Sequence, residues 1–341
     1  PAPLSFRKNR GVSMETTKKQ RPQKFRAKER KIAKAEASAA RIPWKKSLRT
    51  YWQLYLMLIP VIAYFIIFKY WPMYGVQIAF RNYSPVLGFW KSEWVGLQYF
   101  KQFFNSFSFS TVLTNTVSLS VYLLIVSFPA PIILALLLNE IQNHRFKKLL
   151  QTVTYAPHFL SMVVMISMLL VFIDVDNGII NTLIIQLGGE SKDFISDPKW
   201  FRHLYVITDI WKGAGWGSII YLSSLSSISP QLYEAAKIDG ASRFKQLISI
   251  TLPSLAPTIV LMLIMECGRI MNVGFEKVLL MQNSLNVDAS EVISTYVYKI
   301  GISQMQFSYS TAIDLFNSVI NLIMLLTVNA ISKRYSESSL F

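Results

Sequence analysis

The stretch Tyr233-Glu-Ala-Ala-Lys-Ile-Asp-Gly240, followed after nine residues by Ile250-Thr-Leu-Pro253, decides how this chain is organised. Ser229 can cap a helix, Pro230 suits a first helical position, and residues 231–238 are mostly helix formers. Gly240 readily takes the left-handed conformation that ends a helix. The pattern predicts a short helix that ends at Gly240 and a second one over about residues 242–252.

The first of these helices has a slim surface with one charge, made by Glu234, Ala235 and Ala236. Such a surface suits a helix that enters a groove on another protein. On composition alone, an ordinary helix-turn-helix connector explains the segment equally well. Its position between two apolar spans, together with its full spacing, favours a docking loop over residues 229–253.

The composition is that of a membrane protein. Hydrophobic residues make up 52% of the chain and charged residues 16%, where soluble domains carry about 25% charged residues. A span needs roughly 20 apolar residues. We therefore predict an all-α protein with six transmembrane helices, a basic tail over residues 1–50 and a membrane domain over residues 51–341. The predicted spans are residues 52–68, 112–138, 153–173, 204–222, 255–273 and 312–331. The fourth is the weakest pattern, because two charges and three glycines interrupt it.

Basic residues predict the orientation. Residues 1–50 hold 16 Lys and Arg against 3 acidic residues, and the short loop with Arg145, Lys147 and Lys148 carries the same excess. The positive-inside bias places both termini and the 229–253 loop in the cytoplasm. The tail is expected to lie against anionic lipid headgroups. A nucleic-acid-binding arm is disfavoured, because the tail lacks a folded reading module.

The motifs for catalysis are missing from the sequence. It has no phosphate-binding Gly-x-x-x-x-Gly-Lys-Ser/Thr motif and no Ser/His/Asp arrangement. The three histidines, at 144, 158 and 203, have no carboxylate or thiol at metal-ligand spacing. Cys267 is the single cysteine, so packing is its default role. We predict no enzyme activity and no metal or cofactor in this chain. If ATP drives its function, the ATPase is a separate chain.

Polar residues inside predicted spans need an explanation, because they are expensive in a bilayer. Glu266 and Arg269 are three apart on the fifth span, and Asn272 lies three further on, which predicts one helical face. Glu266 and Arg269 either lock helix packing as an ion pair or line a path for a polar solute. Both interpretations stay open.

Two other spans offer candidates for the same path. On the fourth span, Trp211, Lys212 and Trp216 could stack on sugar rings and donate hydrogen bonds, although Trp also anchors helices at the interface. On the second span, Asn115 and Tyr122 are weaker candidates. Pro129 in that span removes a backbone donor and predicts a bend.

The loop resembles the EAA loop of permease subunits of binding-protein-dependent ABC importers. Seven positions carry this resemblance and would contact the ATPase: Glu234, Ala235, Ala236, Gly240, Ile250, Leu252 and Pro253. Further segments look like carbohydrate-uptake permeases of maltose-importer type, within the subgroup that imports oligosaccharides such as pectin- or alginate-derived uronic sugars. These segments are residues 128–140, 151–158, 215–221 and 274–280.

The resemblance implies a MetI-like permease fold in a bacterial inner membrane. It also implies a second, similar permease, an ATPase dimer with ATP and Mg, an external solute-binding protein and an oligosaccharide substrate. By this resemblance the loop transmits ATPase closure to a cavity that alternates its exposure. An ion-coupled secondary carrier and a structural assembly factor are the alternatives. The carrier leaves the EAA-like loop unexplained, and the assembly factor leaves the polar span residues unused.

Overall fold

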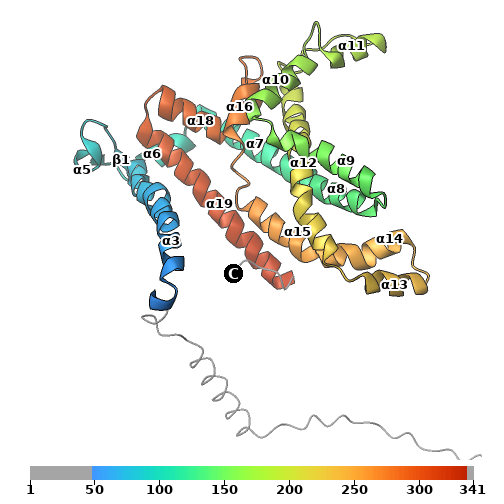
Figure 1. Cartoon of the computed structure of the whole chain (residues 1–341). Helices are drawn as coiled ribbons and strands as arrows, with labels where there is room; N and C mark the ends of the chain where they lie inside the picture. The colour runs from blue at the N-terminus through green and yellow to red at the C-terminus, as the bar shows by residue number, and fades with distance from the viewer. Residues whose placement is uncertain (1–47, 336–341) are drawn as a thin grey trace, which may run out of the picture. The chain divides into compact units, whose positions relative to one another are not determined.

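The computed structural model describes residues 48–335, which are helical almost throughout (Figure 1). The chain divides into two compact units, Pro1–Tyr74 and Gly75–Phe341. Residues 1–47 of the predicted basic tail lie outside the described part. The described strands form one short ribbon, in which β1 (Arg81–Asn82) pairs antiparallel with β2 (Glu93–Trp94).

The first unit contains one apolar helix. It begins with α3 (Trp52–Phe65), widens into the π-helical turn η1 (Ile66–Tyr70) and continues through α4 (Trp71–Met73). The 3-10 helix η2 (Tyr74–Phe80) follows. Residues 48–335 bury none of the side chains of α3, η1 or α4. An apolar helix of this kind needs lipid or another protein as its cover.

The second unit holds the remaining helices. Up to the long central helix they are α5 (Gly88–Lys91), α6 (Gln98–Phe104), α7 (Phe107–Tyr122), η3 (Leu123–Ser127), α8 (Pro129–Glu140), α9 (His144–Tyr155), η4 (Ala156–Phe159), α10 (Met162–Phe172), α11 (Ile179–Gln186) and α12 (Pro198–Ser226). After it come α13 (Pro230–Ile238), α14 (Arg243–Gln246), η5 (Leu247–Thr251), α15 (Leu252–Cys267), α16 (Phe275–Met281), α17 (Val287–Ser290), α18 (Ile293–Tyr298), η6 (Lys299–Ser303) and α19 (Phe307–Tyr335).

Four helical segments in the described chain are long and apolar enough to cross a membrane. They are Trp52–Phe80, Phe107–Glu140, Arg243–Cys267 and Phe307–Arg334. They overlap the first, second, fifth and sixth predicted spans. The pair formed by His144–Phe159 and Met162–Phe172 makes a fifth if it counts as one span. The structure therefore has four to five candidate spans, fewer than the six predicted from the sequence.

The predicted span over residues 153–173 is not one straight helix. It breaks between Phe159 and Met162, where the two parts meet at a bend of 105°. Pro157 cannot donate a backbone hydrogen bond, so the helix tightens into η4, and Leu160 then adopts an extended conformation. Ser161 restarts the chain as α10 by accepting a hydrogen bond from the Val164 N–H.

The predicted span over residues 204–222 lies within α12, a single helix of 29 residues. At 1.5 Å per residue it is about 43 Å long, which is enough to cross a bilayer. It is not among the apolar candidates, because charged residues and glycines lower its hydropathy. In Figure 1, α12 runs through the middle of the second unit, and it packs against α8, α9, α15, α16 and α17.

Glycine lets α12 approach its neighbours closely. A Cβ atom on Gly215 would lie 1.9 Å from the carbonyl oxygen of Thr154 in α9, and one on Gly217 would lie 3.0 Å from the Pro131 ring in α8. The hydrophobic core continues on both sides of this crossing. One cluster joins α7, α10, α12 and α16, and another joins α8, α12 and α15. The helix α12 is therefore the packing centre of the second unit.

Three π-helical turns each precede a proline by two positions. The turns η1, η3 and η5 are followed by Pro72, Pro129 and Pro253. A proline in a helix clashes with the carbonyl of the fourth residue before it, and here that residue always lies inside the widened turn. The helices therefore continue past these prolines.

The predicted short helix over residues 242–252 is wrong in its end point. The helical segment that begins at Arg243 passes Pro253 and runs on to Cys267.

Candidate functional site

The loop between α12 and α15 is held in one defined shape by its own backbone. The helix α13 ends at Ile238 with Asp239 as its C-cap, and Gly240 has φ of +73°. The Ala241 N–H donates to the Ala236 carbonyl at 2.8 Å, and the Gly240 N–H donates to the Lys237 carbonyl at 3.1 Å. These two bonds form the Schellman motif that closes a helix C-terminus. Ser229 occupies the N-cap position, but its side chain makes no cap hydrogen bond.

Side chains fix this loop from within. Tyr233 and Thr251 share a hydrogen bond of 3.0 Å between their hydroxyls, which ties α13 to η5. The buried Gln246 donates from Nε2 to the Ala241 carbonyl at 2.8 Å. Arg243 lies 3.6 Å from the carboxylate of Glu140, at the end of α8, in an exposed pair. The loop therefore has a defined shape of its own, and we call its two helices, α13 and α14, the platform.

The outward side of the platform is apolar and lightly charged. Glu234 and Ala235 are exposed and Ala236 is half-buried. Ile238 next to them is 87% exposed, and Leu232 and Phe244 are also exposed. Of the remaining motif positions, Ile250 and Leu252 are half-buried and Pro253 is exposed. Exposed apolar side chains on a rigid helix are typical of a surface that another protein covers.

Glu266 and Arg269 contact each other at the end of α15. Arg269 donates from Nη2 at 2.6 Å and from Nε at 3.1 Å, both to Oε2 of Glu266. The Glu266 side chain is 43% exposed and the Arg269 side chain is 69% exposed, so water reaches both. The two N–H donors of Arg269 engage a single carboxylate oxygen. The guanidinium therefore keeps further donors for an external acceptor.

The prediction that Asn272 shares a helical face with this pair is wrong. The helix α15 ends at Cys267, and a series of turns carries the chain from there to Met271. Asn272 instead accepts hydrogen bonds from the side chains of Asn317 and Asn321 on α19, at 3.0 Å each. Asn321 also accepts from the Met271 N–H at 3.0 Å. Asn272 thus joins this segment to α19.

Trp216 and Lys212 lie where α12 meets the bend between η4 and α10. The Trp216 ring stacks on the His158 ring, with centroids 4.5 Å apart and an interplanar angle of 3°. Lys212 donates from Nζ to the carbonyl of Leu160. Trp211 is 40% exposed and makes no ring contact within residues 48–335. The structure therefore brings Lys212 and Trp216 to one place, together with His158, and leaves Trp211 outside this group.

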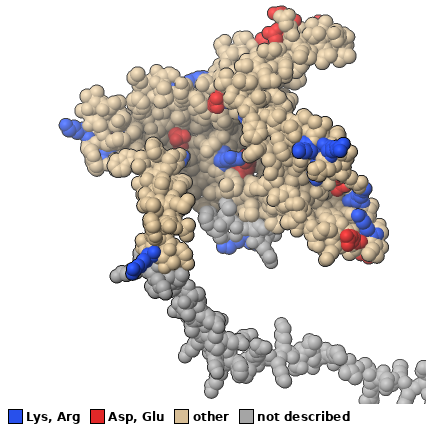
Figure 2. Space-filling view, viewed as in Figure 1, with Lys and Arg blue, Asp and Glu red and all other residues tan. Residues whose placement is uncertain are grey.

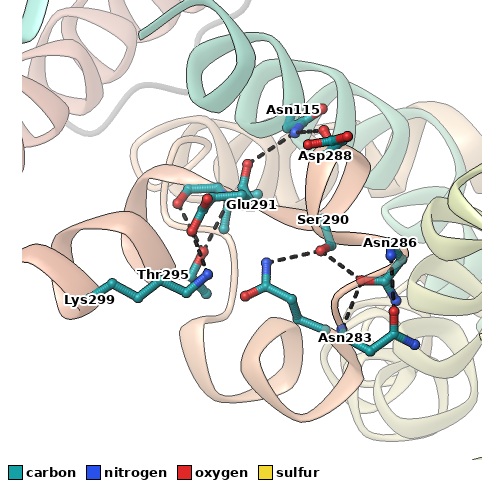
Figure 3. A network of polar contacts seen from close by, with 10 residues as sticks. Asn115, Asn283, Asn286, Asp288, Ser290, Glu291, Thr295 and Lys299 are labelled. Atoms are coloured by element: carbon teal, nitrogen blue, oxygen red, sulfur yellow. Dashed lines mark hydrogen bonds and ion pairs between the residues drawn. The ribbon is translucent and has the colours of Figure 1, made fainter. Parts of the chain in front are cut away.

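Asn115 is buried and fully hydrogen-bonded. It donates from Nδ2 to the carbonyls of Asp288 and Glu291, at 2.8 and 3.1 Å (Figure 3). Its Oδ1 accepts from Nη2 of Arg202 at 3.0 Å. These bonds tie α7 to α12 and to the segment around α17. Tyr122, two turns further along α7, bonds through its hydroxyl to Nδ1 of His203 at 2.8 Å. Both residues connect α7 to α12.

The segment between α16 and α18 contains a polar network that the sequence did not reveal (Figure 3). Asn286 is fully buried and donates to the carbonyls of Ile195 and Met281 at 2.7 and 2.9 Å. Its Oδ1 accepts from the Ser290 hydroxyl at 3.0 Å, and Glu291 pairs with Lys299 at 2.6 Å. The Gln282–Ser290 stretch is rich in Asn and Ser, which is a signal for turns but not for these distant partners.

Lys277 on α16 is a second residue that sequence reasoning missed. It is 2% exposed, and its Nζ donates to the Tyr205 carbonyl at 2.7 Å and lies 3.9 Å from the centre of the Tyr205 ring. Asp209 lies 3.6 Å away and is partly open to water. Burial lowers the pKa of Lys277 to about 8, and the nearby Asp209 carboxylate partly offsets that effect. Asp209 and Lys212 share α12, so Lys277 belongs to the same charged region as Lys212.

No group of three or more His, Cys, Asp or Glu side chains in residues 48–335 is placed to hold a metal ion. Cys267 is buried at the end of α15, as expected for a packing residue. The candidate residues described above make hydrogen bonds, charge pairs and aromatic contacts.

Comparison with known proteins gives the family. Residues 127–337 match the family described as binding-protein-dependent transport system inner membrane component. Protein LplB of Bacillus subtilis (strain 168) is 49% identical over 300 residues, which cover 88% of this chain and 94% of that protein. The polygalacturonan/rhamnogalacturonan transport system permease protein YteP of the same organism is 46% identical over 288 residues, covering 84% and 90%.

A solved structure shares the fold. It is the crystal structure of a bacterial alginate ABC transporter in complex with an alginate pentasaccharide-bound periplasmic protein. One of its chains superposes with a TM-score of 0.81 and 37% identity, covering 87% of this chain and 99% of that one. The predicted permease family, transport role and membrane location are thereby confirmed. This chain belongs to the inner membrane permease components of binding-protein-dependent ABC transport systems.

Proposed function

We propose that this permease imports acidic oligosaccharides derived from plant or microbial polysaccharides. Two observations support this substrate class. Similar proteins are named for transport of polygalacturonan/rhamnogalacturonan and of the acidic polysaccharide alginate. In addition, Lys212 on α12 and Arg269 after the end of α15 carry donors that match carboxylates. The similarity to these permeases over most of the chain is the observation that carries the proposal.

The proposed path combines two types of contact. Trp216 stacked on His158 supplies an aromatic surface for the apolar face of a sugar ring. Arg269, with donors left over from its pair with Glu266, supplies a site for a uronic carboxylate. Lys277 lies 3.6 Å from Asp209 and helps to hold it in place one turn before Lys212 on α12. Asn115, Tyr122 and Asn272 hold the surrounding helices, and Trp211 lies apart from the group.

The proposed assembly contains a second, similar permease and two copies of an ATPase that binds ATP and Mg. An external solute-binding protein delivers the sugar. The platform formed by α13 and α14 is the contact for the ATPase, because it is rigid, apolar on its outer side and carries the EAA-like spacing. Closure of the ATPase dimer would move this platform and, through the continuous Arg243–Cys267 helix, the segment that bears Glu266.

The proposed topology has six spans with both termini in the cytoplasm. It counts α12 as a span because its length suffices, and it counts the bent pair of α9 and α10 as another. The excess of Lys and Arg in the N-terminal tail and in the α8–α9 loop supports this orientation. Asp209 and Lys212 on α12 both have protein partners, Lys277 and the Leu160 carbonyl, which lowers the cost of placing their charges in a membrane.

The topology predicts a specific labelling pattern. In a Cys267→Ala background, Lys237→Cys should react with an impermeant maleimide only from the cytoplasmic side, and Ser284→Cys only from outside. Both positions are exposed within the described chain, and the permease is labelled without its ATPase so that Lys237 stays uncovered. Labelling is measured on right-side-out and inverted vesicles. Reaction of both cysteines from the same side would mean that Arg243–Cys267, the segment between them, does not cross the membrane as proposed.

The substrate proposal predicts how Arg269 affects uptake. Arg269→Gln should weaken uptake of an oligogalacturonate about tenfold or more, because a hydrogen bond between two charged groups is lost. Uptake of the methyl-esterified, neutral oligosaccharide should change little. The measurement compares both sugars in proteoliposomes that contain the complete transporter and its binding protein.

The variants Glu266→Gln and Glu266→Gln/Arg269→Gln separate a substrate contact from a packing pair. If Arg269 binds the carboxylate, the double variant should assemble normally and transport the acidic sugar as poorly as Arg269→Gln does. If the two charges serve only each other, the double variant should regain transport relative to both single variants. Yield of the purified complex, scored separately, shows whether assembly has changed.

A further inference from the structure

The helix α9 presents an unusual mixture of side chains on its outward side. Asn143 caps it by accepting from the Arg145 and Phe146 N–H groups at 3.0 and 3.2 Å, which fixes where the helix begins. Phe146, Leu149 and Val153 are 50%, 58% and 60% exposed. Their spacing of three and four residues places them in one stripe along the helix.

Two basic residues flank this apolar stripe. Arg145 and Lys148 are exposed, and helical geometry places them beside Leu149 on the outward side. Thr154 lies on the opposite, inward side, where its carbonyl faces Gly215 of α12. The outward surface of α9 therefore has a basic edge and an apolar edge. Figure 2 shows basic side chains gathered over α9.

The basic side chains have no partner in the described chain. Arg145, Lys147 and Lys148 make no side-chain hydrogen bond or ion pair with any residue from 48 to 335, and α9 itself contains no acidic residue. Glu140, the acidic residue at the end of α8, pairs with Arg243 on the platform. The positive charge on α9 is therefore available to an external anion.

The apolar stripe indicates what kind of anion this is. The helix α8 packs beside α9, ends the candidate span Phe107–Glu140, and exposes Ile133 and Leu137 (Figure 1). A span that exposes such side chains borders hydrocarbon. A helix at its end with an apolar and a basic edge fits the boundary between acyl chains and headgroups.

We propose that α9 carries a binding site for an anionic phospholipid of the cytoplasmic leaflet. Arg145 and Lys148 contact the headgroup phosphate, while Phe146, Leu149 and Val153 lie against the first methylenes of the acyl chains. The site rests on the orientation given under the proposed function. It lies next to the Glu140–Arg243 pair, so the bound lipid borders the platform that contacts the ATPase.

The test measures lipid retention by the complete transporter. Complexes extracted from membranes are titrated with phosphatidylglycerol and, in parallel, with phosphatidylcholine and inorganic phosphate, and bound lipid is counted by native mass spectrometry. Each basic residue near an anionic surface contributes about 1 kcal/mol, so Arg145→Gln/Lys148→Gln should weaken phosphatidylglycerol binding about 25-fold. The matched control Lys192→Gln/Lys199→Gln removes the same charge from two exposed positions at and before the start of α12, and it should retain the lipid.

Three results would overturn the proposal. The first is equal retention of phosphatidylglycerol by the two double variants. The second is tight retention of phosphatidylcholine at the same site, or saturation by inorganic phosphate alone. The third is loss of the ATPase subunit from the Arg145→Gln/Lys148→Gln complex with unchanged lipid, which would assign α9 to a protein contact. The charge-preserving variant Arg145→Lys/Lys148→Arg should keep the lipid and shows whether the fold survives substitution. None of these readouts depends on the transported sugar.

Discussion

Gly215→Ala should prevent the permease from accumulating as a folded complex. A Cβ atom at this position would lie 1.9 Å from the Thr154 carbonyl oxygen, and backbone atoms cannot rotate away as a flexible side chain does. The helices α12 and α9 would have to separate, which would open the packing centre of the second unit. Overpacking of this severity costs about 3 kcal/mol or more. Fluorescence-detected size-exclusion chromatography and thermal melting of the purified complex measure the effect.

Gly213→Ala is the matched control for this substitution. Gly213 lies on the same helix, but a Cβ atom there meets nothing within 4 Å. Alanine favours helix over glycine by about 1 kcal/mol, so this variant should fold at least as well as the wild type. Similar yields and melting temperatures for the two variants would show that α9 and α12 do not cross as closely as described.

Gly240→Val should separate ATP hydrolysis from transport. Gly240 has φ of +73°, which a β-branched residue tolerates poorly, so the Schellman motif that ends α13 should open. The platform would then lose the shape that the proposed ATPase contact requires. In proteoliposomes, we expect ATP hydrolysis without stimulation by the loaded binding protein, and uptake reduced to background.

The surroundings of Gly240 make this a test of backbone conformation alone. A Cβ atom there meets nothing within 4 Å, so no clash with a neighbour contributes. Asparagine tolerates positive φ better than other non-glycine residues, and Gly240→Asn should therefore keep most of the coupled uptake. If both variants lost coupled uptake equally, the requirement at this position would be the absence of a side chain and not the positive φ. Normal stimulated uptake by Gly240→Val would contradict the role of the platform in coupling.

Local sequence signals predicted the local structure well. Pro230 at the start of α13 and Gly240 after its end lie where helix-capping rules place them, because these preferences depend on the backbone of a few neighbouring residues. The apolar runs of four spans were equally clear. The break after Phe159 was not predicted, because hydropathy continues through it while the backbone turns by 105°.

The candidate site was harder to predict, because its partners are far apart in the chain. Lys277 contacts Tyr205 and Asp209, about seventy residues earlier, and no spacing rule relates them. Asn115 was a weaker candidate for the solute path, and its Nδ2 donates to carbonyls more than 170 residues later. An ion pair of Glu266 and Arg269 was one of two open interpretations, and the structure brings these residues, three apart in sequence, into contact. Asn272 was misplaced because the helix stops at Cys267.

The π-helical turn η5 has a mechanical consequence for the link between the platform and the membrane. A π-helical turn holds one residue more than the α-helix around it, and one residue corresponds to about 100° of rotation about the helix axis. Chain length within Leu247–Thr251 thus sets the angle at which α14 leaves the axis of α15. Loss of a single residue there would rotate the platform by about 100° about the axis of α15. The side-chain contacts within α15 would keep their register.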